Sequence, residues 1–165
     1  MIYLYVLITL IPSFFLWLIM HELSHLFMAR ALLDVTKYKI KLYPHRVEYD
    51  SQKFFRWASV EYWINKLPSP KQQFAVSMAP RIMNIVACIM LPLGALLSFS
   101  TLYLVAWYVF WASGLIDFAY GSLGSSAVCD TMKAARAIDV NSGIIKIFGL
   151  IMVIASVLIT LITNT

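Results

Sequence analysis

Charged residues are scarce in this sequence. They make up 13% of its 165 residues, against about 25% in a typical soluble domain, while hydrophobic residues make up 61%. These proportions exclude an ordinary soluble domain and indicate an integral membrane protein. One stretch of 35 residues, Ile82–Ile116, carries no formal charge and would be about 52 Å long as a single helix. A hydrocarbon core is only roughly 30 Å thick, so we expect this stretch to fold back at a turn near Ser98–Thr101.

Cysteines and processing signals are also few. The two cysteines, Cys88 and Cys129, are not enough for a disulfide framework. The N-terminal stretch Met1–Ala29 lacks both the early Lys or Arg and the small-residue cleavage site of a removable signal peptide, so we expect it to be a retained membrane span.

The hydropathy pattern predicts a single all-α membrane domain over residues 1–165 with about four transmembrane helices. The expected spans cover residues 2–29, 72–98, 101–120 and 144–162. A different period appears in residues 35–63, between the first two spans. There "KYKIKLY" alternates Lys with Tyr, Ile and Leu, and after a break at Pro44 both "VEYD" and "RWASVEYW" alternate again. This period of two predicts two or three short antiparallel strands, a small hairpin or sheet beside the membrane. Ser69 then fits a helix N-cap before Pro70.

Positive charge is concentrated between the first two spans. Ten of the 13 Lys and Arg residues lie from Arg30 to Arg81. Because cytoplasmic loops carry the excess of positive charge, we expect residues 30–81 inside and both termini outside, in the cell membrane of a prokaryote. Contact with the lipid bilayer and retention of topology account for the basic charge, and nothing in the sequence points to nucleic acid.

The chemistry-bearing motif lies inside the first apolar span, in "WLIMHELSHLFMAR". His21 and His25 are one helical turn apart, so both imidazoles can face one atom, and Glu22 can reach a water held on that atom. This is the H-E-x-x-H pattern of zinc hydrolases, in which two His residues bind the metal and the Glu is the general base. The same groups without a metal would leave buried polar atoms unsatisfied at several kcal/mol each, which favours one bound Zn²⁺.

A catalytic zinc needs a third protein ligand and an open position. The sequence offers four candidates, and they are Glu48, Asp117, Cys129 and Asp130. We favour Asp130, because it follows the helix-breaking stretch "GSLGSSAVC" and opens a new helical run, from which a carboxylate can be aimed at a cavity. Glu48 instead suits a cross-strand partner for Lys, and Asp117 a cap at the end of the third span.

Three segments together resemble the site-2 proteases, a family of intramembrane zinc metalloproteases. They are "HELSH"; "MAPRIMN", which is similar to the family's A-G-P-x-x-N; and "CDTMKAARAI", which is similar to its D-G-G-R-x-x-R-A-L. The resemblance implies a minimal catalytic core that cleaves transmembrane protein substrates within or near the bilayer. Ala79 and Thr131 depart from the family's glycines, and Ser122 stands about where the family carries Asn-Pro. The substrate or oxyanion contact then falls to Asn84 or Ser122, or to Ser125 or Ser126.

Two other classes of function remain open from the sequence. One is a non-catalytic membrane protein that binds or transports a metal ion with the same His and Asp residues. The other is a structural partner or inactive homologue without zinc. Glu22 discriminates between them and the hydrolase, because an ion path does not require a carboxylate beside the metal.

Overall fold

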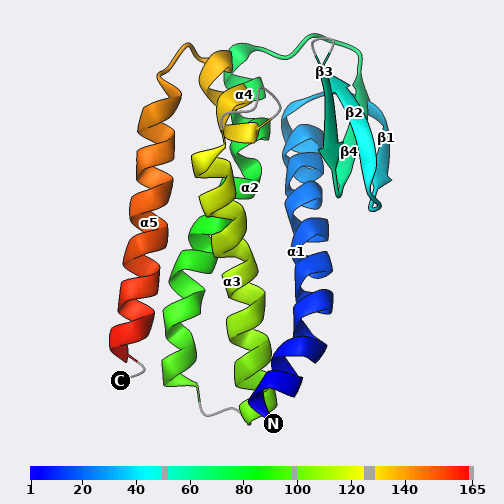
Figure 1. Ribbon diagram of the computed structural model, residues 1–165. Coiled ribbons are helices and arrows are strands. Elements are labelled where there is room, and N and C mark those ends of the chain that lie inside the picture. The colour runs from blue at the N-terminus through cyan, green and yellow to red at the C-terminus, as the bar shows by residue number, and fades with distance from the viewer. Residues whose placement is uncertain (50–51, 98–99, 125–128, 164–165) are drawn as a thin grey trace. The chain divides into compact units, whose positions relative to one another are not determined.

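The computed structural model describes residues 1–49, 52–97, 100–124 and 129–163. Within these ranges four helices are long and apolar enough to cross a bilayer (Figure 1). They are α1 (Ile2–Leu32), α2 (Pro70–Leu93, continued by the 3₁₀ turn η1, Gly94–Leu96), α3 (Thr101–Leu123) and α5 (Ser142–Thr163). The predicted fold class is confirmed: a mostly helical, integral membrane protein with a small antiparallel strand region between α1 and α2.

The described residues form two compact units. The helix unit comprises Met1–Trp17, Arg81–Leu123 and Lys146–Thr165, and the strand unit comprises Leu18–Pro80 and Gly124–Ile145. Helices α1 and α2 each contribute residues to both units. The short helix α4 (Asp130–Ala137) belongs to the strand unit.

The helix unit has an apolar core around the indole of Trp17. Its buried members come from α1, α2 and α3, and they are Trp17, Ala87, Cys88, Leu91, Leu115 and Phe118. Helix α5 is tied to α2 by the hydroxyl of Ser156, which donates to the Cys88 carbonyl at 2.8 Å. Gly114 allows the close approach of α3, because a Cβ there would lie 2.5 Å from the Trp17 ring. Small residues of this kind let membrane helices pack closely.

The charge-free stretch folds back as predicted, and its two flanking charges meet. Arg81 precedes the stretch and Asp117 follows it, and their side chains pair with Nη1 to Oδ2 at 3.9 Å. Arg81 Nη1 also donates to the Asp117 carbonyl at 3.3 Å. The pair neutralises two charges that membrane-spanning helices would otherwise carry alone. Of the predicted turn at Ser98–Thr101, residues 98–99 lie outside the described residues.

Four strands follow α1 in the described part of the chain. They are β1 (Val35–Lys41), β2 (His45–Tyr49), β3 (Gln52–Arg56) and β4 (Ser59–Ile64). They form two antiparallel ladders, β1 with β4 and β2 with β3. The sequence predicts two or three strands because "RWASVEYW" alternates without interruption, but the chain leaves the ladder at Trp57 and Ala58. This break lets the inner hairpin end and the chain return to pair with β1.

Side-chain bonds fix the start of α2 against the end of α1. The backbone N–H of Gln72 reaches Ser69 Oγ at 3.3 Å, and the N–H of Ser69 donates to Gln72 Oε1 at 2.9 Å. This reciprocal pair is a capping box, and it confirms Ser69 as the N-cap. Gln72 Nε2 also donates to the Leu32 carbonyl at 2.7 Å, so the first turn of α2 is held at the last turn of α1. The first turns of α2 are thereby held near the His-bearing part of α1.

Candidate metal centre

The predicted His pair lies on helix α1, in the part of the helix that belongs to the strand unit. His21 and His25 lie one turn apart, and their rings pack edge to face with centroids 5.3 Å apart. The hydroxyl of Ser24 donates to the His21 carbonyl at 2.6 Å, so this serine is satisfied within the helix. Both imidazoles turn to the same side of the helix, as the i, i+4 spacing predicts.

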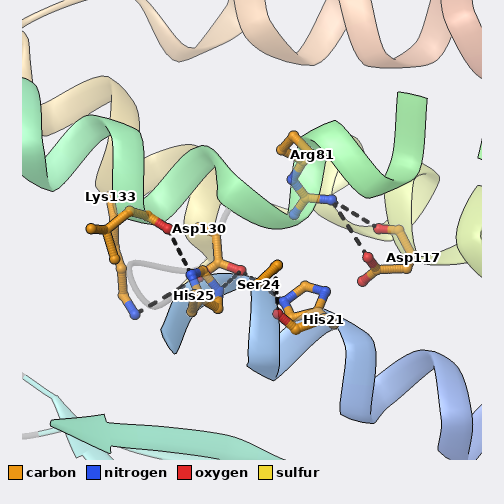
Figure 2. Close-up of polar contacts among 8 residues, drawn as sticks. His21, Ser24, His25, Arg81, Asp117, Asp130 and Lys133 are labelled. Carbon is orange, nitrogen blue, oxygen red and sulfur yellow. Dashed lines mark hydrogen bonds and ion pairs between the residues drawn. The ribbon is translucent and has the colours of Figure 1, made fainter. Parts of the chain in front are cut away.

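Asp130 meets both imidazoles from the start of α4. Its Oδ2 lies 3.2 Å from Nε2 of His21 and 3.2 Å from Nε2 of His25 (Figure 2). The three side chains are only 11–13% exposed. Of the described residues, these three form the group of His, Cys, Asp or Glu side chains that could hold a metal ion, with one ligand atom from each within 4.8 Å of the others.

Two of the three separations among these atoms fit a tetrahedral ion. Ligand atoms about 2.0–2.1 Å from zinc lie about 3.3 Å apart at the tetrahedral angle, close to the two 3.2 Å separations here. Two neutral imidazoles and one carboxylate are also a donor set that catalytic zinc uses, with the fourth position left for water or substrate. The residues present therefore fit a divalent metal of this kind.

The Asp130 carboxyl is held in its ionised form. Burial alone would raise its pKa, but the facing rings of His25 and His21 outweigh burial and keep the pKa well below the usual value. Lys133, three residues further along α4, lies with Nζ 4.0 Å from Asp130 Oδ1. A metal ligand must be deprotonated, so this environment prepares Asp130 to bind a cation.

A backbone carbonyl of α2 orients His25. Nδ1 of His25 lies 2.7 Å from the carbonyl oxygen of Val76, so Nδ1 donates and Nε2 keeps its lone pair for a metal. In an α-helix that carbonyl would accept from the residue four positions later, and here this residue is Pro80, which has no N–H. Helix α2 continues through Pro80, whose side chain is fully buried. The proline thus leaves the Val76 carbonyl available to the histidine.

Glu22 lies beside the cluster and outside it. It is 6% exposed and is not one of the three grouped ligand residues. It lines a cavity of about 110 Å³ together with His25 and Asp130, and Lys133 and Tyr62 line the same cavity. A carboxylate that shares a small cavity with the ligands without joining them can act on a molecule bound there.

The other third-ligand candidates have different surroundings. Glu48 is exposed on β2 and stands opposite Lys53 of β3, the cross-strand partnership expected from the sequence. Asp117 pairs with Arg81 in the helix unit. Cys129 directly precedes Asp130 and is partly exposed, and its sulfur is not one of the grouped ligand atoms.

Two of the four predicted substrate contacts, Asn84 and Ser122, belong to the helix unit. Asn84 on α2 is fully buried, and its amide makes no hydrogen bond to any described residue. Ser122 on α3 is buried as well. Ser125 and Ser126 lie outside the described residues. A role for these four in binding substrate stays a prediction.

Sequence reasoning missed the Val76 carbonyl and the lining residue Tyr62. The signal for Val76 was present, because a proline inside a helical run frees the carbonyl four residues earlier. Tyr62 could not be predicted from the sequence, because nothing in the pattern of a strand shows which of its tyrosines will line a cavity.

Comparisons of this chain with family models, with curated proteins and with solved structures gave no match.

We expect loss of any one ligand side chain to remove most of the bound metal. His21→Ala, His25→Ala and Asp130→Ala each leave two donors, too few to hold zinc against water. Glu48→Ala and Asp117→Ala are the controls and should keep wild-type metal. The measurement is metal per protein by mass spectrometry, after equilibration with zinc and desalting. Full metal in Asp130→Ala, with loss in either control, would contradict this assignment.

Pro80→Ala should weaken metal binding although residue 80 is not a ligand. The new N–H would compete with His25 for the Val76 carbonyl, and loss of such an outer contact typically costs 10–100-fold in affinity, so we expect about tenfold. Competition against a zinc indicator measures this. Pro12→Ala is the matched control, since Pro12 also lies inside a helix but in the helix unit. Equal affinity of wild type and Pro80→Ala would show that the proline does not position His25.

Proposed function

We propose that this protein is an intramembrane zinc endopeptidase that cleaves membrane-protein substrates within or near the bilayer. One observation carries the proposal: Glu22, a buried carboxylate that is not a ligand candidate, lines the same small cavity as His25 and Asp130. Metal storage or transport needs ligands alone, whereas hydrolysis also needs a base beside them. The three-segment resemblance to site-2 proteases supports the same conclusion.

In the proposed mechanism each polar residue has one task. His21, His25 and Asp130 would hold the ion, and the Val76 carbonyl keeps His25 in the tautomer that can bind it. Zinc, when bound, polarises the scissile carbonyl and makes a water acidic enough to lose a proton near neutral pH. Glu22 takes that proton as general base and returns it to the leaving amine.

The substrate has to reach this cavity in an extended form. In an intact helix the scissile carbonyl is occupied by its own hydrogen bond, so the helix must unwind locally. The β1–β4 and β2–β3 ladders are both two-stranded, so each has edges. An unwound segment could add to such an edge as an extra strand, which would satisfy its freed backbone groups.

Glu22→Gln should separate catalysis from metal binding. The amide keeps the shape of the side chain but cannot accept the proton, so bound zinc should match the wild type while cleavage falls by at least about 10²-fold. The experiment compares membranes containing either protein and maps new peptide ends by mass spectrometry. New ends within or beside membrane spans should appear with the wild type and disappear with Glu22→Gln or a chelator. The same ends at the same level in Glu22→Gln would exclude the hydrolase and favour a non-catalytic metal protein.

The topology forms part of the proposal. From the ten basic residues between Arg30 and Arg81 we expect that segment to lie in the cytoplasm and both termini outside. In a background without Cys88 and Cys129, a cysteine at Ser51 should be shielded from an impermeant thiol reagent in intact cells, and one at Thr163 should react. Permeabilised cells, in which both should react, are the control. The opposite labelling pattern would reverse the orientation.

A further inference from the structure

A second hollow lies in the strand unit, next to the cavity of the metal centre. Its volume is about 350 Å³, near the lower end of the range for ligand pockets. Lys133 and Arg136 of α4 line it, and Tyr62, Gln73 and Ser77 contribute polar groups. No Asp or Glu is among its lining residues. The lining of the hollow therefore carries two positive charges and no negative one, and Asp130, which lies 4.0 Å from Lys133, lines the neighbouring cavity.

The two cations keep binding capacity for a ligand. Lys133 is 4.0 Å from the nearer Asp130 oxygen, too far for a hydrogen bond, and the other oxygen of Asp130 faces the histidines. Arg136 has no carboxylate partner among the described residues and presents five N–H donors in a planar fork. The hydroxyls of Tyr62 and Ser77 likewise make no hydrogen bond to a described residue. Cations and hydroxyl donors around one space are the chemistry that binds a carboxylate or phosphate.

The hollow adjoins the candidate catalytic cavity. Tyr62, Ser77 and Lys133 line both. A group held by Lys133 would therefore lie close to Asp130, and an extended peptide advances only about 3.3 Å per residue. An anion in the hollow and a peptide bond at the metal centre can thus belong to one substrate, about one to three residues apart.

We propose that the Lys133–Arg136 hollow is a specificity subsite that takes an acidic side chain of the peptide substrate, within about three residues of the scissile bond. The inference rests on the proposed peptidase function. A carboxylate on the substrate would neutralise positive charge in the hollow, and Arg136 can bind it with two parallel hydrogen bonds. The continuity with the metal cavity favours a peptide over a lipid headgroup, because the peptide has to pass there.

Binding of two matched peptide pools tests the subsite. The peptides are acetylated and amidated heptamers with a neutral dye, apolar except for one Glu in the first pool and one Gln in the second. Zinc-loaded protein in phosphatidylcholine nanodiscs should bind the Glu pool about tenfold more tightly, by fluorescence anisotropy. Arg136→Gln should bring this ratio close to one, and Lys133→Gln should lower it. Arg136→Lys should retain part of it. Arg46→Gln is the matched control, because Arg46 is exposed on β2 and outside the hollow, and it should keep the full ratio.

Three outcomes would contradict the proposed subsite. They are equal affinity of the wild type for both pools, an unchanged ratio in Arg136→Gln, and loss of the ratio when phosphatidylglycerol replaces half of the lipid. The last would assign the hollow to the headgroup of an anionic lipid. Cleavage of the Glu pool is measured separately. A wild-type protein that prefers Glu but cleaves nothing would refute the proposed function and leave the anion site standing.

Discussion

The contact of the buried Asp130 carboxylate with two imidazoles is the interaction on which the arrangement of the strand unit depends. An ionised carboxylate out of water is tolerated only with a compensating charge, and both Nε2 atoms lie 3.2 Å from Oδ2, where one shared cation would neutralise the carboxylate. This requirement fixes α4 against α1, although the two segments are more than 100 residues apart in sequence. The polar cluster thus organises the packing around it.

Irregular backbone supplies what regular helices cannot. A regular α2 would use the carbonyls of its interior internally, and Pro80 releases one of them for His25. The histidine then has a fixed ring orientation without a second buried side chain, which would need its own partner in an apolar setting. Gln72, which forms the capping box with Ser69, also holds the first turn of α2 beside α1 through its bond to the Leu32 carbonyl. Pro80 and Ser69 thus act on the metal centre only through the backbone of α2.

Local periodicity was enough to predict the four spans, the strand region and the placement of His21 and His25 on one face of their helix. These features depend on residues a few positions apart, where helix or strand geometry alone decides the outcome. The interruption at Trp57 could not be predicted, because it follows from which strands pair, and pairing is a long-range choice. Asp130 was favoured because it follows a helix-breaking stretch, but its distance to the histidines depends on packing between segments that are distant in sequence. The hollow beside Lys133 depends on packing in the same way, because its lining comes from strands and helices far apart in the chain.

The ribosome makes the two histidines well before Asp130, because the residues are far apart in the sequence. His21, Glu22 and His25 enter the membrane with the first span, and Asp130 follows His25 by 105 residues. At about 5–20 residues per second, the ribosome needs roughly 5–20 s to bridge that gap. During this interval the first span carries its histidines without their carboxylate partner, and a three-ligand centre cannot exist. A nascent chain therefore remains chemically incomplete while its own spans are being inserted, and the centre assembles only after the third span has been made.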